Sequence, residues 1–111
     1  YELHVDDGYA RAIGYPGRVA HGLLGLALAD GLKNRAAVRF AAIVSLGWRW
    51  KFTGPILIGD RIAARIRVVA KRETRKPDRG IVTIEVTLTN QRGETVQQGE
   101  NDMMVWRKVS A

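Results

Sequence analysis

The stretch LHVDDGYARAIGYPGRVAHGLLGLALADGL, residues 3–32, decides the fold of this chain. It joins a polar segment that carries a histidine to a segment that is apolar on nearly every helical face. Between Val19 and Leu32 only His21 and Asp30 are strongly polar. A helix without a polar face has to be covered on all sides, and this one is too short to cross a bilayer. We therefore expect the rest of the chain to wrap it.

The first half of this stretch predicts a short helix over residues 6–14. Asp6 or Asp7 is suited to cap its N-terminus, and Gly14 is a typical stop. Residues 15–17, Tyr-Pro-Gly, then turn the chain, because proline disfavours helix in the residue before it.

The second half predicts a long helix that starts near Val19 or His21 and ends between Gly31 and Asn34. Gly25 lies in its interior, where glycine costs about 1 kcal/mol relative to alanine. Its presence indicates that another part of the chain packs too close for a side chain.

Beyond residue 35 the hydrophobic period changes from that of a helix to that of strands. Alternating residues buried on one face predict strands over residues 38–46, 48–52, 62–71, 82–89 and 95–108. Residues 91–94 predict a hairpin turn, and residues 73–79 an exposed loop. One helix followed by four or five antiparallel strands predicts an α+β domain whose sheet is wrapped around the helix.

Composition limits the function classes. Lysine and arginine outnumber acids 18 to 11, and the net charge of +7 favours anionic partners. There is no cysteine, which excludes a disulfide, a thiol nucleophile and a cysteine-ligated metal. The length predicts one domain over residues 1–111. We find no signal-peptide or membrane-spanning pattern and expect a cytoplasmic protein, and no motif of RNA-binding sheets accompanies the charge.

Two segments resemble the MaoC-type dehydratases, a family of hot-dog folds that includes (R)-specific enoyl-CoA hydratases. The first contains Leu3-His4-Val5-Asp6 and, further on, Ala20-His21-Gly22-Leu23. The second is FTGPILIGD, residues 52–60. The resemblance implies a curved antiparallel sheet around one long helix, in agreement with the strand pattern. The family's motif is Asp-x-Asn-Pro-Leu-His, of which only Leu3-His4 is present. Its aspartate would lie two places before Tyr1, where the resemblance also implies a first strand.

The resemblance implies a catalytic site. Hydration of an enoyl thioester needs two acid–base groups and a donor to the thioester oxygen. His4 would take one acid–base role and the motif aspartate the other, while the Gly22 backbone N–H would donate to the oxygen. Glycine at that position lets the thioester approach the backbone closely. No metal ligand set is present, and coenzyme A is expected only as part of the substrate.

Four further residues are candidates for substrate binding: His21, Asp6, Trp48 and Trp50. Each also has a structural interpretation. His21 suits the helix entry, Asp6 suits a helix cap, and the tryptophans suit packing on a sheet face or at a subunit interface. Asp30 is expected to be a polar surface or interface group. The basic residues of the strands are expected on a solvated face, where one or two would hold coenzyme A phosphates: Arg49, Lys51, Arg61, Arg65 and Arg67.

The sequence thus predicts an acyl-CoA hydratase or dehydratase that acts as a homodimer or larger assembly and binds neither nucleic acid nor membrane. A non-catalytic acyl-CoA-binding subunit and an acyl-CoA thioesterase are the alternatives. The thioesterase would need a carboxylate on or near the helix, and Asp30 is the only acid inside it.

Overall fold

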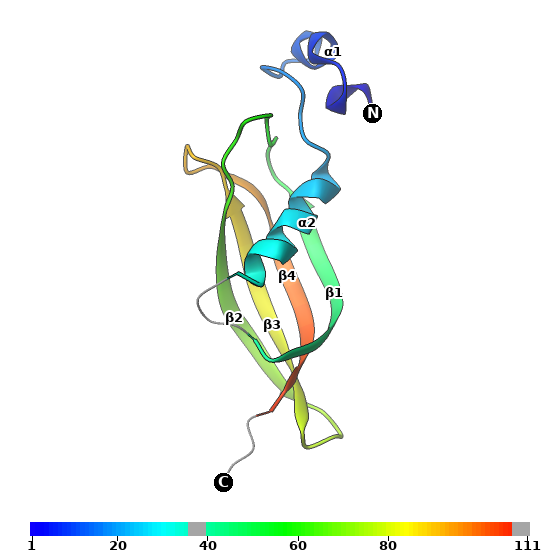
Figure 1. The fold of residues 1–111 in the computed structure, drawn as a ribbon, viewed down its shortest axis with the longest axis vertical. Helices are drawn as coiled ribbons and strands as arrows, with labels where there is room; N and C mark the ends of the chain where they lie inside the picture. Colours follow the sequence, from blue (N-terminus) through cyan, green and yellow to red (C-terminus); the bar gives the residue numbers. More distant parts are fainter. Residues whose placement is uncertain (36–39, 108–111) are drawn as a thin grey trace.

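The computed structural model describes residues 1–35 and 40–107. Four antiparallel strands form one sheet in the order β1-β4-β3-β2. Helix α2 lies across one face of this sheet, and α1 lies beyond the end of the sheet from which α2 begins (Figure 1). The elements in chain order are the one-turn helix η1 (Glu2–His4), α1 (Asp7–Ala12), α2 (Gly22–Lys33), β1 (Ala42–Phe52), β2 (Ala63–Glu73), β3 (Arg79–Thr89) and β4 (Thr95–Trp106).

Both helices of the opening stretch form where the sequence predicts them. Asp6 caps α1 by accepting a hydrogen bond from the Tyr9 N–H at 3.1 Å. Gly14 follows this helix with a φ of 105°, a conformation that favours glycine. His21 is the N-cap of α2, and the helix ends at Lys33, within the predicted limits. The entry and length of the central helix are therefore confirmed.

The core lies between α2 and the sheet. Of the predicted buried row in β3, Ile84, Val86 and Leu88 are fully buried, and Val82 is partly buried against them. On α2 the buried positions Gly25 and Ala29 are one turn apart, so small residues face the sheet. The helix backbone can approach the strands closely for this reason.

The strands differ from prediction in some of their boundaries and in one buried row. The predicted segments 38–46 and 48–52 are joined in one strand, β1, which begins only at Ala42, while residues 38 and 39 of the first segment lie outside the described part. The predicted loop over 73–79 is shorter, because Glu73 still pairs with Gly80 in the β2–β3 hairpin. In β2 the predicted buried row fails after Ile66. Val68 and Ala70, on either side of a register shift in the pairing with β3, are both exposed.

The expectation that the chain covers α2 on all sides is wrong. Leu23, Leu24 and Leu28 face away from the sheet and are 60%, 53% and 45% exposed. A four-stranded sheet covers one side of a helix, so an apolar strip stays open. Among residues 1–35 and 40–107, no helix combines the length and the apolar character that crossing a membrane would take.

Candidate active site

A pocket of about 500 Å³ lies at the N-terminal end of α2. Four parts of the chain form its wall: the N-terminal turn, the entry of α2, the end of β1 with the loop that follows, and β4. The lining residues are Tyr1, His4, Tyr15, Val19, Ala20, His21, Gly22, Leu23, Phe52, Thr53, Gly54, Pro55, Ile56 and Gln97. Three of the predicted site residues, His4, His21 and Gly22, therefore meet in one cavity.

His4 is held in a defined orientation by the segment that leads into α2. Its Nδ1 lies 2.7 Å from the Val19 carbonyl oxygen, and the Leu3 carbonyl accepts the Val19 N–H at 3.1 Å. Because a carbonyl can only accept, Nδ1 of His4 carries the proton. In the neutral ring Nε2 then has the free lone pair, which is the form that a general base needs.

His21 stands beside His4, with ring centroids 5.0 Å apart. Its Nδ1 accepts the Leu23 N–H at 3.2 Å, and its carbonyl accepts the Leu24 N–H at 2.9 Å. These bonds satisfy two of the N–H groups that the first turn of a helix leaves unpaired. The predicted structural role of His21 as the helix entry is confirmed, while its predicted contact with substrate stays a prediction.

The Gly22 N–H is the next group in this turn. No acceptor for it lies among the residues that the structure describes. A backbone donor at a helix N-terminus also carries the positive end of the helix dipole, which favours developing negative charge. The position of Gly22 in the pocket wall thus has the chemistry of an oxyanion donor.

Phe52 from the end of β1 lies directly over Gly22. A methyl group added at residue 22 would meet two carbons of the Phe52 ring at 2.8 and 2.9 Å. The absence of a side chain therefore leaves just enough room for the ring. Phe52 is more than half exposed and lines the pocket, so it forms an apolar wall next to the Gly22 backbone.

Gln97 of β4 forms the floor of the pocket below the first turn of α2. The residue is only 2% exposed. Its Nε2 donates to the Gly22 carbonyl at 3.2 Å, and its Oε1 accepts the Trp50 Nε1–H at 2.9 Å. The sequence analysis missed this residue. Two amides of β4, Gln97 and Asn101, are buried in the core among apolar residues, so the polar–apolar alternation of this strand does not mark Gln97 in the sequence.

The two tryptophans and Asp6 do not line this pocket. Trp48 and Trp50 pack edge to face at 5.3 Å, partly buried against the core. This geometry agrees with the packing interpretation. Asp6 serves as the cap of α1, which accounts for its carboxylate. Their assignment to substrate binding stays a prediction without support from the geometry.

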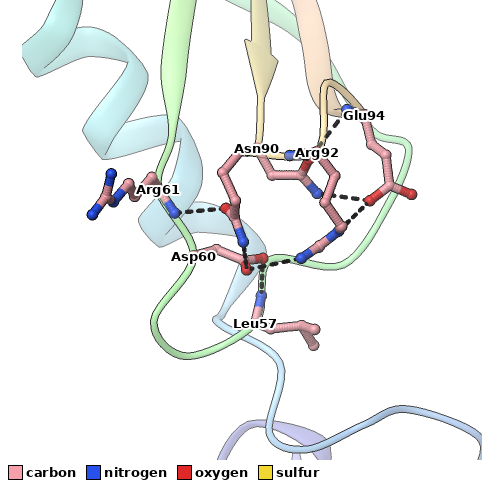
Figure 2. Close-up of polar contacts among 7 residues, drawn as sticks. Leu57, Asp60, Arg61, Asn90, Arg92 and Glu94 are labelled. Carbon is pink, nitrogen blue, oxygen red and sulfur yellow. Dashed lines mark hydrogen bonds and ion pairs between the residues drawn. The ribbon is translucent and has the colours of Figure 1, made fainter.

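The pocket loop, residues 53–60, is fastened to the β3–β4 hairpin by Asp60 (Figure 2). The Asp60 carboxylate accepts hydrogen bonds from the Leu57 N–H and the Gln91 side chain, both at 2.9 Å, and lies 3.6 Å from Arg92. The same loop also contacts the segment that leads into α2, because the Ile56 carbonyl accepts a hydrogen bond from the Ala20 N–H. The wall of the pocket is therefore tied both to the helix entry and to the sheet.

The hydrogen bond from Gln91 is the largest influence that holds the pKa of Asp60 below its ordinary value. The Leu57 N–H and the positive charge of Arg92 act in the same direction. The side chain is 5% exposed, so the ionised carboxylate is nearly closed off from solvent and relies on these partners. The sequence analysis identified Gly59-Asp60 only as a turn.

The basic residues of the strands occupy the outer side of the sheet, as predicted. Arg49 pairs with Asp102 at 2.7 Å, and Arg67 pairs with Glu85 at 3.3 Å. The hydrogen bond from Arg49, followed by that from Thr83, lowers the pKa of Asp102 to about 2. None of these basic side chains lines the pocket at the end of α2.

None of the residues that line the pocket carries a carboxylate. Asp30 is half exposed and forms an ion pair with Lys33 at 2.8 Å. It lies eight residues along the helix from Gly22, or about 12 Å at 1.5 Å per residue. The acid that a thioesterase would need on this helix is therefore far from the cavity.

The fold and the site together define a class of protein: an α+β hot-dog domain with a histidine and the Gly22 N–H of the first turn of a helix in one pocket. The MaoC like domain family matches residues 2–90. The chain belongs to this family. The resemblance seen in the sequence is thereby confirmed.

Relatives agree with this assignment. The chain is 30% identical over 98 residues to an (R)-specific enoyl-CoA hydratase from Aeromonas caviae, covering 88% of this chain and 69% of the relative. A MaoC-like dehydratase from Rhodospirillum rubrum superposes with a TM-score of 0.88 at 28% identity, covering 99% of this chain and 77% of that one.

A protein from Mycobacterium tuberculosis described as having a double hotdog fold superposes with a TM-score of 0.82. Its identity is 23%, and the match covers 98% of this chain and 34% of the other. At this identity the comparison speaks for the fold alone. The predicted hot-dog architecture is confirmed.

Proposed function

We propose that this protein adds water to, or removes water from, the α,β double bond of an enoyl-CoA thioester. The observation that carries the proposal is the position of His4. A carbonyl fixes the proton on its Nδ1, and its ring lines the same pocket as the Gly22 N–H. A general base and an oxyanion donor in one cavity are two of the three groups that this reaction requires.

In the proposed reaction, water binds next to His4 Nε2. As the water oxygen forms its bond to Cβ, Nε2 takes a proton, and negative charge spreads to the thioester oxygen. The Gly22 N–H stabilises this charge, and the reaction ends when a proton reaches Cα. By the family resemblance, the carboxylic acid of the motif aspartate would give that proton to Cα, and the proton held on His4 Nε2 would then return to the carboxylate. Coenzyme A takes part only as the carrier of the substrate.

The test is hydration of crotonyl-CoA by the full-length gene product, followed as loss of the enoyl-thioester absorbance. We expect His4→Ala to lower kcat on the order of 100-fold or more. His4→Gln keeps a donor for the Val19 carbonyl but cannot exchange protons, and we expect the same loss. The control is Glu2→Gln, an exposed residue in the same turn. Unchanged turnover in both His4 variants would contradict the proposal.

The departure from the family motif at Tyr1 and Glu2, where asparagine and proline are expected, favours a second candidate, a subunit that binds acyl-CoA without converting it. The same preparation distinguishes the two functions. Saturable binding of crotonyl-CoA with no loss of absorbance would identify the binding subunit, whereas turnover that depends on His4 would exclude it.

We also propose that the protein works as a homodimer or larger assembly. The support is the open strip of Leu23, Leu24 and Leu28 on α2, since exposed apolar strips favour association. Leu24→Lys should shift the mass measured by light scattering from that of an assembly to that of one chain. A wild-type protein that is monomeric at working concentration would contradict this part of the proposal.

A further inference from the structure

We propose that Gln97 is a positioning residue that fixes the first turn of α2 so that the Gly22 N–H faces the reacting thioester. The inference rests on the proposed function, because it takes Gly22 as the oxyanion donor. Gln97 reaches this turn from β4, a strand 75 residues away in sequence from Gly22. It connects the sheet to the one glycine whose backbone has to be placed accurately.

The two partners of Gln97 leave its amide only one orientation. The Trp50 indole N–H can only donate, so it requires the amide oxygen, and the Gly22 carbonyl can only accept, so it requires the amide nitrogen. A rotation of the amide by 180° would lose both bonds. The side chain is almost fully buried, and water is not at hand to replace either partner.

Gly25 supplies a second, independent observation. A methyl group at residue 25 would lie 2.6 Å from Cδ of Gln97. The helix therefore leaves open one site in its buried face, and the Gln97 amide occupies that site. A glycine in the interior of this helix predicts that another part of the chain packs against it too closely for a side chain. The group that does so is the amide of Gln97.

The other end of α2 offers a matched control. Asn101, four residues further along β4, accepts a hydrogen bond from Lys33 Nζ at 3.1 Å and is also fully buried. Gln97 and Asn101 thus hold the two ends of the same helix on the same strand. Only Gln97 contacts the pocket. Loss of either amide should weaken the fold, but only loss of Gln97 should slow the reaction.

The experiment compares crotonyl-CoA hydration and thermal unfolding for Gln97→Met, Gly25→Ala and Asn101→Ala in the full-length protein. We expect Gln97→Met to lower kcat on the order of 10- to 100-fold with a smaller change in KM, because the donor is misplaced rather than removed. Gly25→Ala pushes the amide aside and should show the same kinetic loss. Its Tm should fall less than that of Gln97→Met, because alanine favours the helix.

Asn101→Ala should lower Tm and leave kcat within about twofold of wild type, far below the loss expected from a misplaced donor. Should this variant not fold, Ser45→Ala, which removes an acceptor of the Asn101 amide, takes its place. Equal kcat in Gln97→Met and wild type would overturn the inference. So would a loss of kcat in the Asn101 or Ser45 variant as large as that in Gln97→Met.

Hydrogen exchange of the backbone amides tests the inference without turnover. Gln97→Met should speed exchange in the first turn of α2 and leave its last turn unchanged. A wild-type protein that does not hydrate crotonyl-CoA would contradict the proposed function, whereas unchanged exchange in the first turn would contradict the role of Gln97 in holding it.

Discussion

The two ends of α2 are built differently although both rest on β4. At the N-terminal end a glycine faces a pocket of about 500 Å³, and its N–H has no acceptor among the described residues. At the C-terminal end Lys33 is 7% exposed, and its amine is shared by Asn101, Asp30 and the ring of Trp48. Within the described part of the chain, the N-terminal end thus keeps one N–H without an acceptor, and the C-terminal end pairs the amine that it buries.

This difference separates function from stability along one helix. A buried amine has to be paired, since an unpaired charge in a core is strongly unfavourable. An unpaired N–H beside a pocket costs less because water or a ligand can reach it. Substitutions at the open end should therefore change turnover, and substitutions at the closed end should change the free energy of unfolding.

The largest effect is expected from Gly22→Ala. Its methyl group would collide with the Phe52 ring and fill the space next to the N–H. We expect kcat for crotonyl-CoA hydration to fall on the order of 100-fold, comparable to the loss of one oxyanion donor. Gly31→Ala is the matched control, because a methyl group there meets nothing within 4 Å. Similar kcat values for the two variants would contradict the assigned role of the Gly22 N–H in the reaction.

At the closed end, Lys33→Met should destabilise the fold and spare the reaction. Asn101 would lose its donor in the core, which costs about 1–3 kcal/mol, while the half-exposed Asp30 returns to water. Urea unfolding measures the loss, and kcat of the folded fraction should stay within about twofold of wild type. A variant as stable as wild type would show that the buried amine is not needed.

Low pH should destabilise the fold through Asp60, which fastens the loop that forms the pocket wall at the open end of α2. Its pKa in the folded protein lies below 3.8, so the ionised carboxylate stabilises the fold at pH values above 3.8. This contribution is lost as the pH falls through the folded pKa. Asp60→Asn should thus be less stable than wild type at pH 7, and the gap should narrow below pH 3.8. Unfolding curves at pH 7 and below pH 3.8 measure this difference in the free energy of unfolding. A difference that does not change with pH would contradict a stabilising role of the ionised Asp60 carboxylate.

The smallest effect is expected on the outer side of the sheet, away from both ends of α2. Arg67 and Glu85 form an exposed pair, and such pairs contribute about 0–1 kcal/mol. Arg67→Ala should change neither kcat nor the free energy of unfolding by more than this. A large loss of activity would mean that the outer face takes part in the reaction.

Most of the fold could be predicted from sequence, because its signals are local. The cap at Asp6, the apolar run after His21 and the alternation in residues 82–89 each determine their own element. His4, His21 and Gly22 could be placed in one site only through the resemblance to the family, since spacing alone does not mark them as a site. The structure confirms that these three residues line one pocket.

The residues that were missed depend on register between distant elements. Gln97 becomes part of the site only because β4 brings it beneath Gly25, and Lys33 is buried only because Asn101 lies opposite it. Neither contact produces a recognisable spacing in the sequence, because its two residues lie in elements far apart along the chain. The exposed leucines of α2 were misjudged for a related reason: the apolar pattern indicates that a surface will be covered but not which chain covers it.

The central claim is that the Gly22 N–H at the open end of α2 meets the thioester oxygen. The most direct test is a titration of the ¹⁵N-labelled full-length protein with butyryl-CoA, a saturated thioester that cannot react, followed by amide NMR. We predict that the Gly22 amide proton moves downfield as it gains a hydrogen bond, while the side-chain amide of Asn101 does not move. A Gly22 resonance that stays unchanged at saturating butyryl-CoA would contradict the account.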